Sequence, residues 1–111
     1  MTHKAILDEL RQPTKELHDH IPGVFGGYRA LASAALGDGA LDAKTKELIA
    51  LAIAVTKQCD GCMASHARSA ARRGATAEEV AEALGVAILM NGGPGTVHAP
   101  RAFEAFQEFT T

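Results

Sequence analysis

Residues 43–66 of this chain read AKTKELIALAIAVTKQCDGCMASH, an apolar run followed by two closely spaced cysteines. The run from Leu48 to Val55 is entirely apolar, so periodicity alone does not separate a buried strand from a buried helix. The charged segment at 43–47 and the alternating alanines favour a helix, which we place at 43–56 with Asp42 as its N-cap. A helix that is apolar on every side must be surrounded. We therefore expect other subunits to cover part of it.

The only two cysteines, Cys59 and Cys62, are separated by two residues, and His66 lies four positions after the second. A disulfide between them would close a very short loop and remove little entropy from the unfolded chain. The pair therefore indicates chemistry, as a redox dithiol or as half of a metal site. It lies at the start of a helix that we expect at 60–73, where free N–H groups and the helix dipole favour a thiolate. The spacing places all three side chains on roughly one face.

Glu47 is the fourth candidate, because it precedes the apolar run directly. If the helices at 43–56 and 60–73 pack in antiparallel fashion, Glu47 and His66 are offset by about 5 Å along the axis, at a rise of ~1.5 Å per residue. Side chains and one water bridge such an offset. We therefore expect Glu47 to accept a proton from His66 and orient it, giving a carboxylate–imidazole–thiol relay. The second thiol would then close a disulfide with the first.

The other segments also have helical patterns, and no strand pattern competes with them. Pro13 should kink or split the first helix, and Gly26-Gly27 weaken the second. The segment Thr76–Glu79 has the sequence of a capping box, and the NGGPG segment at 91–95 reads as a loop. We predict an all-α chain of about six helices, at 5–20, 24–36, 43–56, 60–73, 77–90 and 97–109, with Phe103, Phe106 and Phe109 sharing a face of the last.

The length of 111 residues predicts a single domain, 1–111. A net charge of −2 gives no indication of a nucleic acid or an acidic membrane surface as a partner. Asp8 and Glu9 interrupt any signal-peptide core, and the longest apolar run is too short to span a bilayer. We therefore expect a cytoplasmic protein, whose cysteines would be reduced between turnovers.

The four candidates also form a recognisable pattern. The chain has Glu47, eleven residues, Cys59-Asp60-Gly61-Cys62, three residues and His66, and the segment ends at Gly74. This pattern resembles the signature of the AhpD-like alkylhydroperoxidases of the carboxymuconolactone decarboxylase superfamily. The resemblance covers about residues 24–109. Gly61 stands where the best-studied members have a histidine.

The resemblance implies a thiol-dependent peroxidase that needs no cofactor or metal. Cys62 would be the peroxidatic thiol and Cys59 the resolving one, with Glu47 and His66 relaying protons. The implied partners are a hydroperoxide substrate and an external dithiol reductant, such as a lipoyl protein or a thioredoxin-like protein. Relatives of this size are usually trimers or hexamers, so a homotrimer or homohexamer is expected.

Three other interpretations stay open at the level of sequence. Cys59, Cys62 and His66 could be three zinc ligands, with water or a distant residue such as His98 in the fourth position. The chain could also be a carboxymuconolactone decarboxylase-like lyase, for which the cysteines would be dispensable. A non-enzymatic redox-sensing oligomer would form the disulfide without turning over peroxide.

Overall fold

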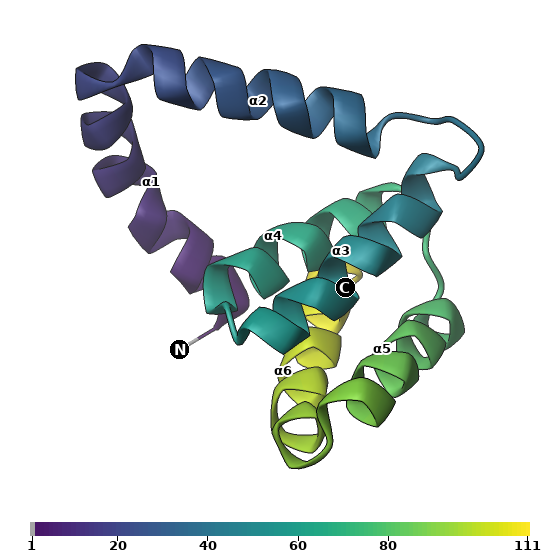
Figure 1. Ribbon diagram of the computed structural model, residues 1–111. Coiled ribbons are helices and arrows are strands. Elements are labelled where there is room, and N and C mark those ends of the chain that lie inside the picture. Colours follow the sequence, from purple (N-terminus) through teal and green to yellow (C-terminus); the bar gives the residue numbers. More distant parts are fainter. Residues whose placement is uncertain (1) are drawn as a thin grey trace.

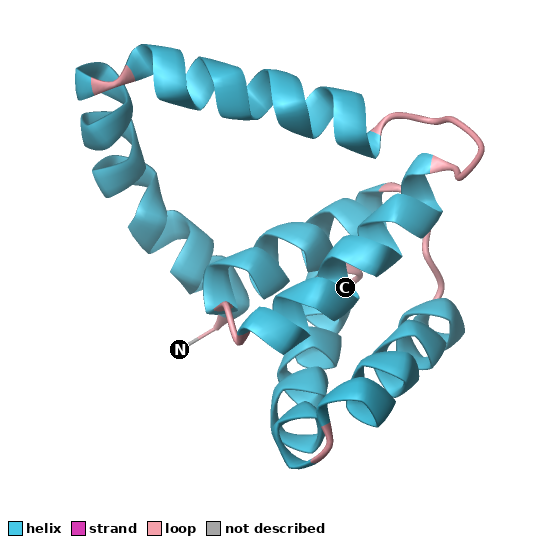
Figure 2. Cartoon of the chain, in the orientation of Figure 1, coloured by secondary structure: helices cyan, strands magenta, loops and turns pink. Residues whose placement is uncertain are grey.

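The computed structural model describes residues 2–111, and this part of the chain is built from helices without strands, which confirms the all-α prediction (Figure 1; Figure 2). Connections of one to six residues join these helices (Figure 2). The six described helices are α1 His3–His20, α2 Pro22–Leu36, α3 Ala43–Lys57, α4 Asp60–Arg72, α5 Ala77–Asn91 and α6 Gly93–Phe109.

The core lies among α3, α4, α5 and α6, where α3 and α6 each contact the other three helices. Alanines make up much of it, and these small side chains let the helix backbones approach closely. Phe106 of α6 is buried in this core, and Phe103 and Phe109 pack against it. The face predicted from the spacing of the three phenylalanines is therefore present. The largest fully buried side chains are Leu51, Val55, Met63 and Val80.

The two N-terminal helices form an arm beside this core. In Figure 1, α1 and α2 meet at one end, and α2 runs from there back toward the start of α3. α1 packs on α4 and also contacts α6. No residue of α2 is buried, although most of its residues are apolar. Much of the apolar surface of the described chain therefore lies on this arm.

The first two helices begin earlier than the sequence-based prediction. α1 begins at His3 and continues through Pro13. Pro13 is exposed, so water can reach the carbonyl group that it leaves without an N–H partner. α2 begins at Pro22, because a proline at the start of a helix has no N–H bond to lose. Gly26-Gly27 do not interrupt this helix.

The segment at 91–95 was predicted as a loop, and this prediction is wrong. α5 continues to Asn91, and α6 begins at Gly93 instead of Val97. Gly92 alone makes the turn, with a φ of 65° that favours glycine. Pro94 then occupies the first turn of α6, where its missing N–H is not needed.

The predicted caps agree with the structure. Thr76 and Glu79 form the capping box of α5, with both of its hydrogen bonds present. Asp42 caps α3 by accepting from the Thr45 N–H at 2.7 Å. Gly74, just beyond α4, has a φ of 82°, as expected for the residue after a helix end.

The apolar run of α3 is covered on one side only. Leu51, Ala54 and Val55 are buried, whereas Ile49 and Ile53 are 45% and 52% exposed. In the described part of the chain, no helix is long and apolar enough to cross a membrane.

Candidate functional site

Cys59 and Cys62 form a disulfide at the N-terminus of α4. Cys59 is the N-cap residue, and its Sγ accepts a hydrogen bond from the Cys62 N–H at 3.2 Å. The helix therefore begins with the sulfur of Cys59 in the place that a serine or aspartate oxygen usually takes. Cys62 is exposed and Cys59 is half-buried. Since both thiols are oxidised, the structure describes the disulfide state of the pair.

Glu47 and His66 meet across the contact between α3 and α4. The Nδ1 atom of His66 lies 2.8 Å from Oε2 of Glu47, which is a direct hydrogen bond. The Glu47 side chain is only 6% exposed, and that of His66 is 26% exposed. The hairpin of α3 and α4, which only Gln58 and Cys59 connect, brings these residues together. The sequence predicted a short gap spanned by side chains and one water, and the structure has direct contact.

This pairing determines which nitrogen of His66 is available for chemistry. A carboxylate is an acceptor only, so the bond to Glu47 assigns the hydrogen to Nδ1. The Nε2 atom then keeps its lone pair and is the basic nitrogen of the ring. Glu47 thus fixes the orientation and tautomer of an imidazole that is partly open to solvent.

The structure does not bring every candidate into contact. Between His66 and Cys62, both within the described chain, no hydrogen bond is present in the disulfide state. His98 lies on α6, and its Nδ1 is buried without a partner. Across residues 2–111, the three-residue group with ligand atoms close enough for a metal ion is His3, Glu104 and Glu108, a set without either cysteine.

Two cavities are lined by residues at or next to the site. Glu47 lines one of about 330 Å³, together with Ser33 and Leu36 of α2 and Arg73. Gly61, between the two cysteines, lines another of about 720 Å³. Sequence reasoning assigned Arg73 only to the end of a helix. No local pattern reveals its place at a shared cavity with Glu47, because α2 reaches that cavity from elsewhere in the chain.

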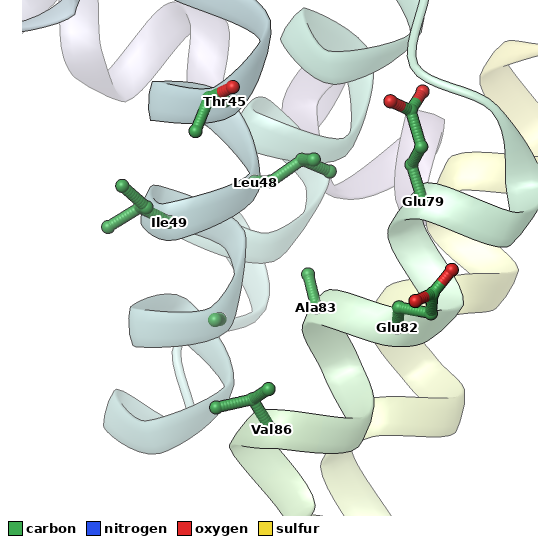
Figure 3. Close-up of a pocket in the computed structure, with 8 residues that line it drawn as sticks. Thr45, Leu48, Ile49, Glu79, Glu82, Ala83 and Val86 are labelled. Carbon is green, nitrogen blue, oxygen red and sulfur yellow. The ribbon is translucent and has the colours of Figure 1, made fainter. Parts of the chain in front are cut away.

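A third cavity, of about 480 Å³, lies between α3 and α5 (Figure 3). Leu48 points across it toward α5, which contributes Ala83 and Val86 together with Glu79 and Glu82 (Figure 3). Glu79 pairs with Lys44 at 2.8 Å, and this contact lowers the pKa of Glu79. None of the four candidate site residues lines this cavity.

The fold and site define a small all-helical protein with a Cys-x-x-Cys disulfide and a buried glutamate paired with a partly exposed histidine. The sequence model of the carboxymuconolactone decarboxylase family matches residues 22–105. The chain belongs to this family, in agreement with the resemblance of its cysteine motif.

Related sequences match most of the chain. An uncharacterized protein of Cupriavidus necator is 40% identical over 103 residues, which are 93% of this chain and 91% of the relative. An uncharacterized protein of Haemophilus influenzae is 46% identical over 91 residues, 82% of this chain and 80% of the relative.

Solved structures share the fold. A carboxymuconolactone decarboxylase family protein from Legionella pneumophila has a TM-score of 0.95 and 43% identity, covering 98% of this chain and 97% of its own. A protein from Thermotoga maritima has a TM-score of 0.83 and 30% identity, and the match covers 95% of this chain and 92% of that protein's chain.

Proposed function

We propose that this protein is a thiol-dependent peroxidase that reduces hydroperoxides through Cys62 and Cys59. The Cys62 thiolate attacks the terminal peroxide oxygen, the O–O bond breaks, and an alcohol leaves after taking up a proton. Cys62 is then a sulfenic acid. The Cys59 thiol condenses with it, releasing water and forming the disulfide. An external dithiol reduces this disulfide and is itself oxidised, which restores both thiols.

One observation carries the proposal: the two sulfurs bond at a helix N-terminus, one and two turns from His66, which is hydrogen-bonded to the buried Glu47. The helix N-terminus favours the thiolate that must attack. His66 supplies a nitrogen able to pass a proton to the leaving alkoxide, and Glu47 orients it. Exposure of Cys62 gives a peroxide and a protein dithiol access to the sulfur.

The reductant follows from the chemistry of the pair. A disulfide at an exposed helix start suits exchange with a second vicinal dithiol, of the lipoyl or thioredoxin-like kind. Such dithiols are kept reduced in the cytoplasm, where we place the reaction. An antioxidative role has also been suggested for a Thermotoga maritima family protein, whose structure matches with a TM-score of 0.69 and 34% identity, over 76% of this chain and 87% of that one.

Peroxide turnover by single-cysteine variants tests the proposal. With a dithiol reductant, Cys62→Ser should consume no peroxide above background. Without reductant, Cys59→Ser should consume one equivalent and accumulate a sulfenic acid at Cys62, visible by mass spectrometry. Turnover that persists in Cys62→Ser would contradict the mechanism. A wild-type protein that forms the disulfide but does not turn over peroxide would be a redox sensor, and lactone decarboxylation by both variants would indicate a lyase.

We further propose that the protein works as a homo-oligomer, a trimer or a hexamer. The support is the apolar surface that one chain leaves open on α2 and α3, including Val24, Tyr28 and Leu31 at 64–66% exposure. These three lie at helical spacing on one face of α2. A contiguous apolar face of this kind is typical of subunit interfaces.

A further inference from the structure

The cavity of about 720 Å³ between α1, α2 and α4 has two chemically different sides. Leu7 and Leu10 of α1 and Phe25 of α2 give it an apolar wall. Four basic residues also line it, against a single acidic one, Asp19. In Figure 1, α1 and α2 form the arm, and α4 lies across the open side between them. The volume is that of a small-molecule site. The basic residues are Arg11, Lys15, Arg29 and Arg68.

Two of these four cations are already neutralised. Arg11 pairs with Asp8, and Lys15 pairs with Asp19, both at 3.0 Å. Within residues 2–111, Arg29 and Arg68 have no carboxylate within 4.0 Å. The cavity therefore keeps an excess of positive charge on two guanidinium groups.

A second feature of Arg68, besides its charge, indicates that the cavity binds an anion. Its Nε atom is buried and has no hydrogen-bond partner. A buried N–H donor without an acceptor is unfavourable, and most such donors in folded proteins are satisfied. Because Arg68 lines the cavity, an acceptor bound there would satisfy it. A carboxylate matches the planar fork of a guanidinium and forms two parallel hydrogen bonds with it.

The cavity also borders Gly61, which lies between the two cysteines. Gly61, Ser65 and Arg68 line it from one face of α4, over about 10 Å of helix at ~1.5 Å per residue. Gly61 directly precedes Cys62. A Cβ atom at Gly61 would lie 3.1 Å from Cδ1 of Leu10, so any side chain here would narrow the cavity at the end nearest the cysteines.

We propose that this cavity binds an amphipathic carboxylate, with its charged end at Arg68 and Arg29 and its apolar chain along Leu7, Leu10 and Phe25. The hydroperoxide of such an acid is then the substrate class of the peroxidase. This second step rests on the function proposed above. The peroxide group, carried on the apolar chain, reaches Cys62 past Gly61, and the reaction is the two-electron reduction already written, with the carboxylate unchanged.

Binding is tested apart from catalysis, by isothermal titration of the oxidised protein with decanoate. Decanol, which has the same chain without the charge, and inorganic phosphate, which has charge without a chain, are the comparison ligands. Decanoate should bind at least about tenfold more tightly than either, because only it satisfies both sides of the cavity. Phosphate that bound as tightly as decanoate would show that the site recognises charge alone, and this would overturn the proposal. The absence of decanoate binding would also overturn it.

Substitutions of cavity residues test whether decanoate binds in this cavity. Arg68→Gln and Arg29→Gln should each weaken decanoate by at least about tenfold. Arg72→Gln removes the same charge from an exposed position of α4 outside the cavity and should leave the affinity unchanged. Arg29 lies on the exposed helix α2, so its replacement tests the site even if Arg68→Gln does not fold. Unchanged affinity in Arg29→Gln and Arg68→Gln alike would contradict the assignment.

Kinetics separate the two proposals. With a fatty-acid hydroperoxide, Arg29→Gln should raise KM by a larger factor than it does with neutral cumene hydroperoxide, whereas Arg72→Gln, outside the cavity, should change the KM of neither peroxide. Decanoate binding without any peroxide turnover would leave the carboxylate site standing and refute the peroxidase. Turnover of both peroxides with equal KM in wild type and Arg29→Gln would refute the substrate class and leave the peroxidase standing.

Discussion

Glu47 and His3 are the polar residues that the structure buries among positions 2–111. A buried carboxylate is unfavourable unless it is paired and hydrogen-bonded. Glu47 has such a partner in His66, at 2.8 Å. A leucine would fill the same place with less desolvation, so packing alone does not account for a glutamate there. Its presence fits a role in orienting the imidazole.

Glu47→Gln keeps the size of the side chain but removes its charge. We expect peroxide turnover to fall by roughly 100-fold or more, as for other proton-transfer groups. The reason is that the amide no longer holds the hydrogen on Nδ1 of His66, so that Nε2 is no longer fixed as the nitrogen that accepts a proton. The measurement is the steady-state rate with saturating dithiol, together with the rate of Cys62 alkylation. Glu82→Gln, on the exposed face of α5, is the control. A Glu47→Gln rate equal to that of the control would refute the relay.

Glu108 fixes the first turn of α1 on α6. Its carboxylate accepts from the backbone N–H of His3 at 3.1 Å and of Lys4 at 3.2 Å. Burial acts to raise the pKa of Glu108, but these backbone bonds and the nearby positive charges outweigh it, so the pKa lies below its usual 4.5. A carboxyl with a lowered pKa stabilises the fold above its unfolded pKa and loses this effect as pH falls through the folded one.

We therefore expect the melting temperature of Glu108→Gln to lie below that of the wild type at neutral pH. The difference should shrink as the pH falls from about 6 to about 3, because the wild-type carboxylate is then protonated. Circular dichroism melts across this range measure it. Glu9→Gln, at an exposed position of α1, should show a constant difference. A Glu108→Gln difference that grew in acid would contradict the assigned sign.

At the scale of the elements, α5 and α6 pack so closely that one glycine is required. A Cβ atom at Gly95 would lie 2.8 Å from the backbone Cα of Ile88, a distance that real Cβ atoms do not adopt. Gly85, inside α5, has open space around it. The two glycines therefore have different roles, although neither has a positive φ.

The matched substitutions Gly95→Ala and Gly85→Ala test this difference. Gly95→Ala should lower the free energy of unfolding by about 1–3 kcal/mol, because α6 must move away from α5. Gly85→Ala should raise it by up to about 1 kcal/mol, since alanine is the better helix former. Urea titrations measure both. A neutral Gly95→Ala would show that α5 and α6 separate without loss of packing.

At the scale of the whole molecule, the chain leaves apolar side chains exposed on the arm and on α3. Leu31 is 64% exposed and Ile53 is 52% exposed. Monomeric proteins rarely leave contiguous apolar faces open. This distribution is the physical basis for the proposed homo-oligomer.

Sedimentation of charged variants tests the proposed assembly. We expect the wild type to sediment as a trimer or hexamer, and Leu31→Glu and Ile53→Glu to shift it toward monomer, because a buried unpaired carboxylate opposes association. Arg72→Glu introduces the same carboxylate at an exposed position of α4 and should not change the mass of the sedimenting assembly. A monomeric wild type at micromolar concentration would refute the assembly.

The sequence alone determined that the chain is helical, which residues cap the helices, and that the cysteine motif lies at the N-terminus of a helix. These are local properties: Asp42, Thr76 and Gly74 act on the backbone within a few residues. It also placed Glu47 and His66 close together, because both helix rise and a two-residue connection are fixed by local geometry. It failed at Gly93-Pro94-Gly95, where glycine is typical of a loop but here permits close packing.

Only the tertiary structure decided what lies around the cysteine motif. The direct contact of Glu47 with His66 depends on how α3 and α4 rotate against each other, which no local pattern specifies. The cavity with Arg29 and Arg68 depends on where the α1–α2 arm lies relative to α4. The reason is physical: spacing along one helix fixes which side chains share a face, whereas contacts between helices follow from packing the whole chain.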